Sequence, residues 1–176
     1  MNWLRLCTLL ALVALPWIAC GGDGPTSPGD GTLEVYLTDA PILGLEQINV
    51  FVEGLTVKPE NGPLRRIATE VGLVDLLKLQ NVTRLLVAAG LEPGRYIHVR
   101  VDLDQERSNV VVEGSREELP LQIASEEIKV LGGFELARGR TTRLTLDFDA
   151  LQSMRQQANG DWLIVPVIVQ TGVERD

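Results

Sequence analysis

Two pairs of aspartates are the residues whose types and spacing could support chemistry. Asp102 and Asp104 are two positions apart, and so are Asp147 and Asp149. Alternate residues of a strand point to one face of a sheet, so each pair would share a face. If the two strands were neighbours, the four carboxylates could hold Ca²⁺, or one of them could gain a raised pKa for acid–base work. Asp39, at the end of an earlier predicted strand, is a further candidate.

The same acids have a simpler interpretation, which we favour. Charged side chains on a solvated sheet face keep the face soluble and discourage edge pairing with other chains. The D-x-D spacing is common, and Asp39 lies in an Asp-Ala-Pro sequence that also suits a turn. We therefore expect no resident cofactor, with calcium as the alternative.

A nucleophilic active site has few residues to draw on. His98 is the only histidine, so a Ser-His-Asp triad would have to include it, and there is no Gly-x-Ser-x-Gly elbow. It lies on the polar face of a predicted strand, where we expect a solvent-facing side chain. One histidine and two cysteines also leave few ligands for zinc or haem. We expect a protein that is not an enzyme, and a carboxylate-dependent hydrolase of the cell envelope is the alternative.

The first nineteen residues predict an export signal that ends before a cysteine. Arg5 supplies a positive charge, residues 6–15 are almost entirely apolar, and Ala19 precedes Cys20. The apolar run is too short to cross a bilayer core of about 30 Å. The segment resembles a bacterial lipobox, which implies cleavage before Cys20 and lipidation of that cysteine, with palmitate among the chains. Ordinary cleavage and an uncleaved anchor are the alternatives.

Lipidation would set the location and the partners of the chain. Loss of residues 1–19 removes Arg5 and no acid, so the net charge would change from −8 to −9. An acidic chain lacks the electrostatic footprint of a nucleic-acid-binding protein. Cys20 would be the only remaining cysteine, which excludes an intrachain disulfide. We expect an exported protein, membrane-anchored in the bacterial cell envelope through Cys20, with a protein or carbohydrate partner.

Length and composition predict one folded domain behind a linker. The chain has 176 residues, of which 45% are hydrophobic and 23% are charged, which suffices for one core. Residues 21–31 (GGDGPTSPGDG) contain no apolar side chain to pack. We therefore expect a lipoprotein signal peptide at 1–19, a flexible tether at 20–31 and the folded domain at 32–176.

Alternation of apolar and polar residues predicts many short strands in the domain. A parity shift at Gly54 predicts a bulge, and Pro166 predicts an edge or bulged strand. Helical spacing predicts a helix over 82–89 that ends at Gly90, and a second one over 149–158, with Leu151 and Met154 facing inward. Residues 72–80 fit either a strand or a helix. The predicted strands are 33–38, 47–58, 64–68, 96–104, 110–112, 119–123, 128–131, 141–149 and 162–169.

These elements predict an all-β protein, because there is no strict alternation of strands and helices. We expect an antiparallel β-sandwich, immunoglobulin-like or transthyretin-like, with one or two short helices. Clean alternation in two strands predicts a core that contains Val99, Val101, Leu144, Leu146 and Phe148.

Several stretches together resemble a known family. They are GTLEVYLTDAP at 31–41, INVFVEG at 48–54, LEPGRY at 91–96, VDLD at 101–104, LGGFEL at 131–136 and TTRLTLDFD at 141–149. Their order and spacing are similar to those of the bacterial and archaeal family called domain of unknown function 4382, which is often found on lipoproteins. The resemblance implies an exported β-sandwich of the transthyretin-like type. The family has no established activity, so the resemblance implies no catalytic residue.

Overall fold

The computed structural model describes residues 29–39 and 44–176, which form strands with two very short helices. The predicted signal peptide, Cys20 and most of the predicted tether lie outside these residues. The elements are β1 (Gly31–Asp39), β2 (Leu45–Pro59), β3 (Arg65–Asp75), the 3₁₀ helix η1 (Leu76–Leu79), β4 (Arg84–Leu91), β5 (Gly94–Val112), β6 (Glu118–Ile123), β7 (Glu127–Leu136), β8 (Thr141–Phe148), α1 (Ala150–Ser153), β9 (Met154–Gln156), β10 (Trp162–Ile164) and β11 (Ile168–Arg175).

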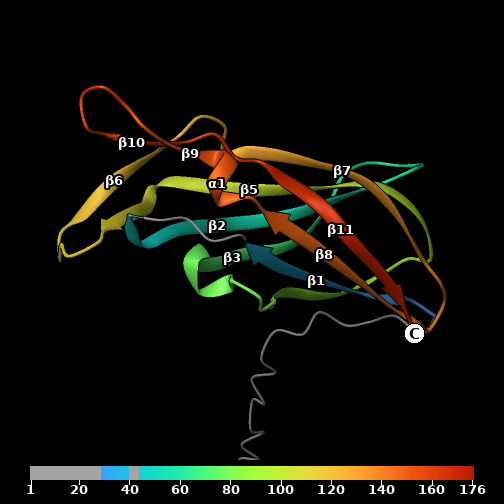
Figure 1. Cartoon of the computed structure of the whole chain (residues 1–176). Coiled ribbons are helices and arrows are strands. Elements are labelled where there is room, and N and C mark those ends of the chain that lie inside the picture. The colour runs from blue at the N-terminus through green and yellow to red at the C-terminus, as the bar shows by residue number, and fades with distance from the viewer. Residues whose placement is uncertain (1–28, 40–43) are drawn as a thin grey trace, which may run out of the picture.

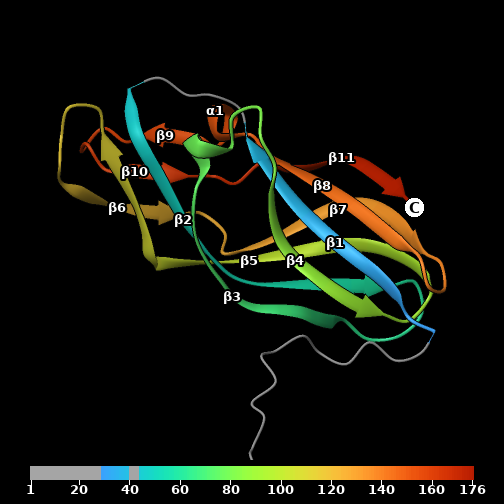
Figure 2. The ribbon, with the colours of Figure 1, turned by 90° about the horizontal axis from the view of Figure 1, so that it is seen from below.

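The strands form two sheets that pack as a sandwich (Figures 1 and 2). The first sheet has the order β11-β8-β1-β4, and the second has the order β3-β2-β5-β6-β10-β9, with β7 also paired to β5. This confirms the predicted all-β sandwich. Both sheets are mixed, since β1 pairs parallel with β8 and β6 pairs parallel with β10. The prediction of an antiparallel sandwich was wrong for these two pairs, because pairing between distant strands leaves no local pattern.

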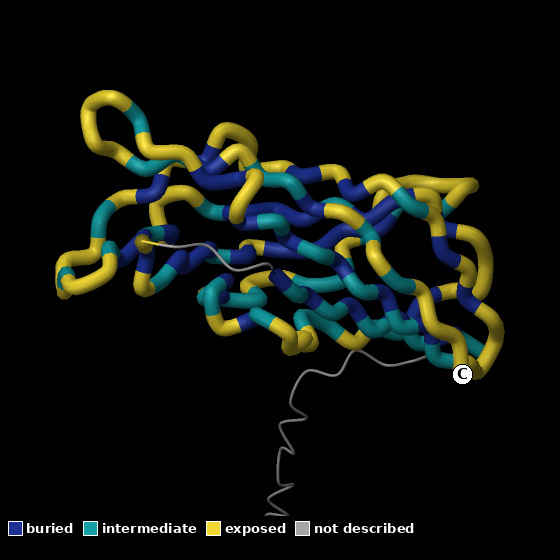
Figure 3. Tube along the Cα trace, in the orientation of Figure 1, coloured by how far each residue is buried: buried dark blue, intermediate teal, exposed yellow. Residues whose placement is uncertain are grey.

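The core lies between the sheets, where the buried residues of the strands gather (Figure 3). Buried and half-buried residues alternate without a break along β1 and β8. The five predicted core residues are all buried. The predicted irregularity at Gly54 is confirmed, because β2 shifts register there against both β3 and β5.

The helix predicted over 82–89 is wrong, because this segment is the edge strand β4. It pairs antiparallel with β1 from Leu91 opposite Gly31 to Arg84 opposite Leu37. A helix of eight residues is marginal in water, whereas pairing with a buried strand satisfies the backbone of the segment. Gly90 continues the ladder opposite Thr32 instead of ending a helix.

The second predicted helix shrinks to α1, which has four residues. Met154 is buried as predicted, but it begins β9, and Leu151 is 64% exposed instead of facing inward. The ambiguous segment 72–80 divides between the end of β3 and η1.

The apolar run 162–169 is not one strand. It divides around Pro166 into β10, which belongs to the second sheet, and β11, which belongs to the first. Proline lacks the N–H that a ladder needs, so it suits the crossing point between two sheets better than a strand interior.

The sandwich has two distinct ends. We call the end where β1 begins the near end; the β2–β3, β4–β5 and β7–β8 turns and the last residues of β11 lie there as well. The opposite end, which carries η1 and α1, is the far end (Figure 1). Within the described ranges, no helix has the length and apolar character needed to cross a membrane.

Candidate functional site

The two aspartate pairs do not come together. Asp102 and Asp104 lie on β5 in the second sheet, whereas Asp147 and Asp149 lie on and just after β8 in the first sheet. The condition for a cluster of four carboxylates, that the two strands are neighbours, is therefore not met. Over residues 29–39 and 44–176, no three His, Cys, Asp or Glu side chains gather closely enough to hold a metal ion. The candidate acids therefore do not form one shared group of ligands.

Three of the candidate acids lie at the far end of the sandwich. Asp39 is buried, and its Oδ1 accepts a hydrogen bond from the Ala150 N–H at 2.9 Å. Asp149 is the N-cap of α1, because its Oδ1 accepts from the Gln152 N–H at 2.9 Å. Burial raises the pKa of the Asp147 carboxyl, and the charge of Asp149 raises it further.

The other two acids form ion pairs with arginines. Asp102 has a side chain only 8% exposed, and its Oδ1 lies 2.9 Å from Arg100 Nε. A solvated face is therefore the wrong description of Asp102. Asp104 Oδ2 lies 2.5 Å from Arg107 Nε, and this hydrogen bond lowers the pKa of Asp104.

His98 is 9% exposed, so the prediction of a solvent-facing histidine was wrong. Its ladder partners are Lys58 on β2 and Leu131 on β7. Burial lowers the pKa of His98, and the charges of Lys129, Lys58 and Arg100 lower it further. The imidazole is held in a positive environment.

A long bulge interrupts the pairing of β5 with β2. Asn49 and Phe51 of β2 pair with Asn109 and Asp104 of β5, so one residue of β2 faces four residues of β5. Ser108 closes the bulge, because its Oγ accepts from the Phe51 N–H at 3.0 Å and donates to the Asp104 carbonyl at 2.6 Å. The polar side chain thus replaces hydrogen bonds that a regular ladder would make.

The bulge borders an open groove of about 640 Å³, which we call the bulge groove. Arg107 lies over the Phe51 ring, with its guanidinium carbon 3.6 Å from the ring centroid. Leu73 of β3 is 44% exposed in the groove wall. The remaining lining residues come from β5 and β6, namely Gln105, Glu106, Ser108, Asn109 and residues 118–122.

Polar side chains in and beside this groove are held in place by one another. Asn49 Nδ2 donates to Asn109 Oδ1 at 2.8 Å, and Asn109 Nδ2 donates to Glu118 Oε2 at 3.0 Å. The groove therefore combines an apolar wall with amide and carboxylate groups of fixed orientation, as small-ligand sites do. Sequence reasoning missed it, although the polar run 105–109 inside an otherwise alternating strand was a signal.

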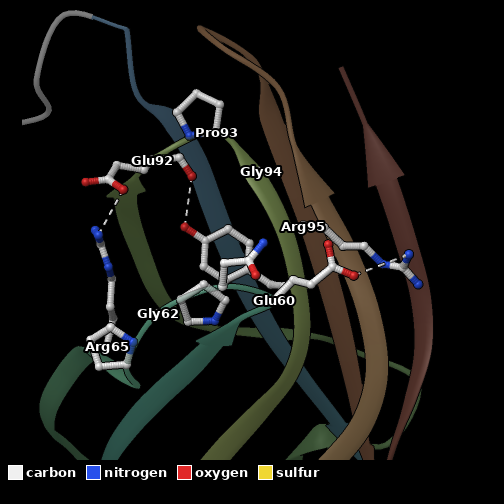
Figure 4. A pocket seen from close by; sticks show the side chains of 11 residues that line it. Glu60, Gly62, Arg65, Glu92, Pro93, Gly94 and Arg95 are labelled. Atoms are coloured by element: carbon white, nitrogen blue, oxygen red, sulfur yellow. Dashed lines mark hydrogen bonds and ion pairs between the residues drawn. The ribbon is translucent and has the colours of Figure 1, made fainter.

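A smaller cleft of about 210 Å³ lies at the near end, between the β2–β3 and β4–β5 turns (Figure 4). Arg65 Nη2 lies 2.9 Å from Glu92 Oε2, and Arg95 Nη1 lies 3.7 Å from Glu60 Oε1. Beneath them, the Tyr96 hydroxyl donates to the Glu92 carbonyl at 2.8 Å. The charged groups of this near-end cleft are thus paired with one another, and these ion pairs connect the two turns.

The chain matches the family model described as domain of unknown function (DUF4382) over residues 30–166, and it belongs to that family. No curated protein and no solved structure matches it. The choice between immunoglobulin-like and transthyretin-like topology therefore stays a prediction.

Proposed function

We propose that this DUF4382 member is an exported domain, held at a membrane of the bacterial cell envelope by lipid on Cys20, that binds a protein or carbohydrate partner in the bulge groove. It works as a binding domain and not as an enzyme. The observation that carries the binding role is the groove itself, with its apolar wall beside fixed amide groups.

The order of the parts supports the anchor. A charged residue, an apolar run and Ala19 precede Cys20, and β1 begins at Gly31, eleven residues after Cys20. At about 3.3–3.6 Å per residue, those eleven residues span at most roughly 40 Å. One acyl chain binds a membrane only weakly, so the proposal requires more than one chain on Cys20.

The placement of the acids favours a binding role over the hydrolase alternative. A carboxylate-dependent hydrolase needs two acids that flank one substrate bond. Here Asp39 and Asp149 accept backbone hydrogen bonds, while Asp102 and Asp104 hold arginines. These acids therefore bind other groups of the fold, and they do not flank a common cleft.

Intact mass and membrane fractionation test the anchor. We expect the wild type in the membrane fraction, with the mass of residues 20–176 plus lipid, and the Cys20→Ser variant without lipid and uncut. Cys7→Ser is the matched control, since Cys7 lies within the signal and should not affect lipidation. A soluble, unmodified wild type with its signal clipped would refute the anchor.

Titration of cell-envelope polysaccharide and peptide fragments tests the groove. We expect Leu73→Gln to weaken the binding of whichever fragment binds, because it places a polar group in the apolar wall. Leu64→Gln is the matched control, since Leu64 is 45% exposed but does not line the groove. Equal loss in both variants would place the binding site elsewhere.

A further inference from the structure

Cationic side chains form a patch on the second sheet, toward its near end. Thr56 of β2 pairs with Arg66 of β3 and with Arg100 of β5, which in turn pairs with Lys129 of β7. This row crosses four strands, or about 15 Å at the usual strand spacing. Lys58 lies two residues from Thr56 along β2, on the same face. We call Lys58, Arg66, Arg100 and Lys129 the basic patch.

The patch is on the outer surface of the sandwich. The intervening residues Leu55 and Val57 of β2, and Val99 and Val101 of β5, are buried in the core between the sheets. Because successive residues of a strand point to opposite faces, Lys58, Thr56 and Arg100 point away from the core. The patch is therefore presented to the surroundings of the domain.

Acids neutralise the patch only in part. Asp102 lies 2.9 Å from Arg100 and 3.9 Å from Arg66, and Glu127 lies 3.3 Å from Arg100. Among the described residues, no carboxylate lies within ion-pair distance of Lys58 or Lys129. This local excess of positive charge contrasts with the net charge of −8 of the chain.

An exposed leucine lies beside these cations. Leu131 of β7 is 71% exposed, and it pairs across the ladder with His98, next to Lys58 and Lys129 in the neighbouring positions. Ile97 is 40% exposed one residue before His98. Cations around exposed aliphatic side chains suit the interface of an anionic membrane, where headgroups meet the charges and the aliphatic groups enter the acyl boundary.

We propose that the basic patch and Leu131 form a second membrane contact, which lays the near end of the second sheet on anionic lipid headgroups. The inference rests on the proposed lipid anchor, which would keep the domain near a bilayer and raise the effective concentration of the patch. The patch lies toward the end of the sandwich at which β1 begins, so the chain from Cys20 enters the domain at the same end as the patch. Glu106 and Glu118 lie farther along the sheet, and an anionic surface repels them. The domain is therefore tilted, with the bulge groove lifted off the bilayer.

A single fluorescent label on the mature lipidated protein tests this contact. With Cys7 removed and Cys20 lipidated, Leu131→Cys carries the only free thiol, which takes an environment-sensitive dye. Leu151→Cys is the matched control, because Leu151 is 64% exposed at the far end. The probes are vesicles of phosphatidylcholine, alone or with phosphatidylglycerol.

We expect both labelled proteins to float with both kinds of vesicle. The dye at position 131 should shift to the blue only on vesicles with phosphatidylglycerol, and the dye at position 151 should not shift. Adding Lys58→Gln, Arg66→Gln and Lys129→Gln should abolish the shift without loss of flotation. Salt at about 1 M should also abolish it, because the Debye length falls to about 3 Å.

The outcomes separate the patch from the anchor. Flotation with both vesicles and no shift at position 131 overturns the patch alone. Flotation only with phosphatidylglycerol overturns the anchor and supports the patch, and flotation with neither overturns both. A blue shift that appears without vesicles and grows with protein concentration, together with a dimer in sedimentation, assigns the patch to a second copy of the chain and overturns the membrane contact.

Discussion

The two ends of the sandwich use charged side chains in opposite ways. At the near end, Arg65 and Glu92 pair across the cleft between two turns, with exposed side chains. At the far end, Asp39 and Asp149 accept hydrogen bonds from backbone N–H groups. An exposed ion pair contributes only about 0.2–1 kcal/mol, whereas a helix N-cap contributes typically about 1 kcal/mol. The acids of the far end are therefore structural, and the near end depends more on the side chains beneath its charges.

Truncation of Tyr96 should have the largest effect on the stability of the near end. Tyr96 is 2% exposed beneath the near-end cleft, and its ring stacks on Phe134 with centroids 4.9 Å apart. Tyr96→Ala should lower the free energy of unfolding by about 3–5 kcal/mol, as other buried aromatic truncations do. Phe148→Ala, at the far end of β8, should cost a similar amount. Urea melts measure both.

Tyr96→Phe separates the ring from its hydroxyl. It removes the hydrogen bond to the Glu92 carbonyl and should cost about 1 kcal/mol. A Tyr96→Ala protein as stable as the wild type would show that the ion pairs, and not the ring, hold the near-end turns.

Removal of the Ser108 hydroxyl tests how much a buried hydrogen bond contributes to stability at the β5 bulge. Ser108→Ala leaves the Phe51 N–H without its acceptor and should cost about 1–3 kcal/mol, because the serine is 4% exposed. Ser125→Ala is the control, since Ser125 is exposed and should change the stability by less than about 0.5 kcal/mol. Equal costs for the two variants would mean that the backbone alone maintains the bulge.

His98 should make stability depend on pH. Its pKa is lowered in the fold, so the unfolded chain binds the proton more tightly. Stability should be complete above the ordinary value of 6.5 and should fall as the pH drops from there through the folded pKa. His98→Gln should remove this part of the slope in thermal melts. A wild-type slope that survives the substitution would assign it to another group.

Asp147 should give the smallest effect, with the opposite sign. Its pKa is raised in the fold, so its contribution is present below the ordinary value of 3.8 and is lost as the pH rises through the folded pKa. Asp147→Asn should therefore raise the Tm slightly at neutral pH and leave it unchanged below 3.8. A lower Tm at neutral pH would show that the ionised carboxylate has a stabilising partner.

Local patterns predicted the parts of this protein that depend on neighbouring residues. The alternation in β1 and β8 identified their buried faces, and the parity shift at Gly54 identified a bulge. The same reasoning failed for residues 82–89, whose spacing fits a helix although they pair with β1. A short apolar segment takes the structure that its partner offers, and the partner is distant in the sequence.

The sequence by itself determined the all-β class and the buried faces of most strands, because both follow from composition or from periodicity over a few residues. The tertiary structure alone decided which strands are neighbours. It separated the two aspartate pairs into different sheets, buried His98 and brought Lys58, Arg66 and Lys129 onto one surface. Strand pairing is non-local, so residues two positions apart reveal a shared face but not what lies beside it.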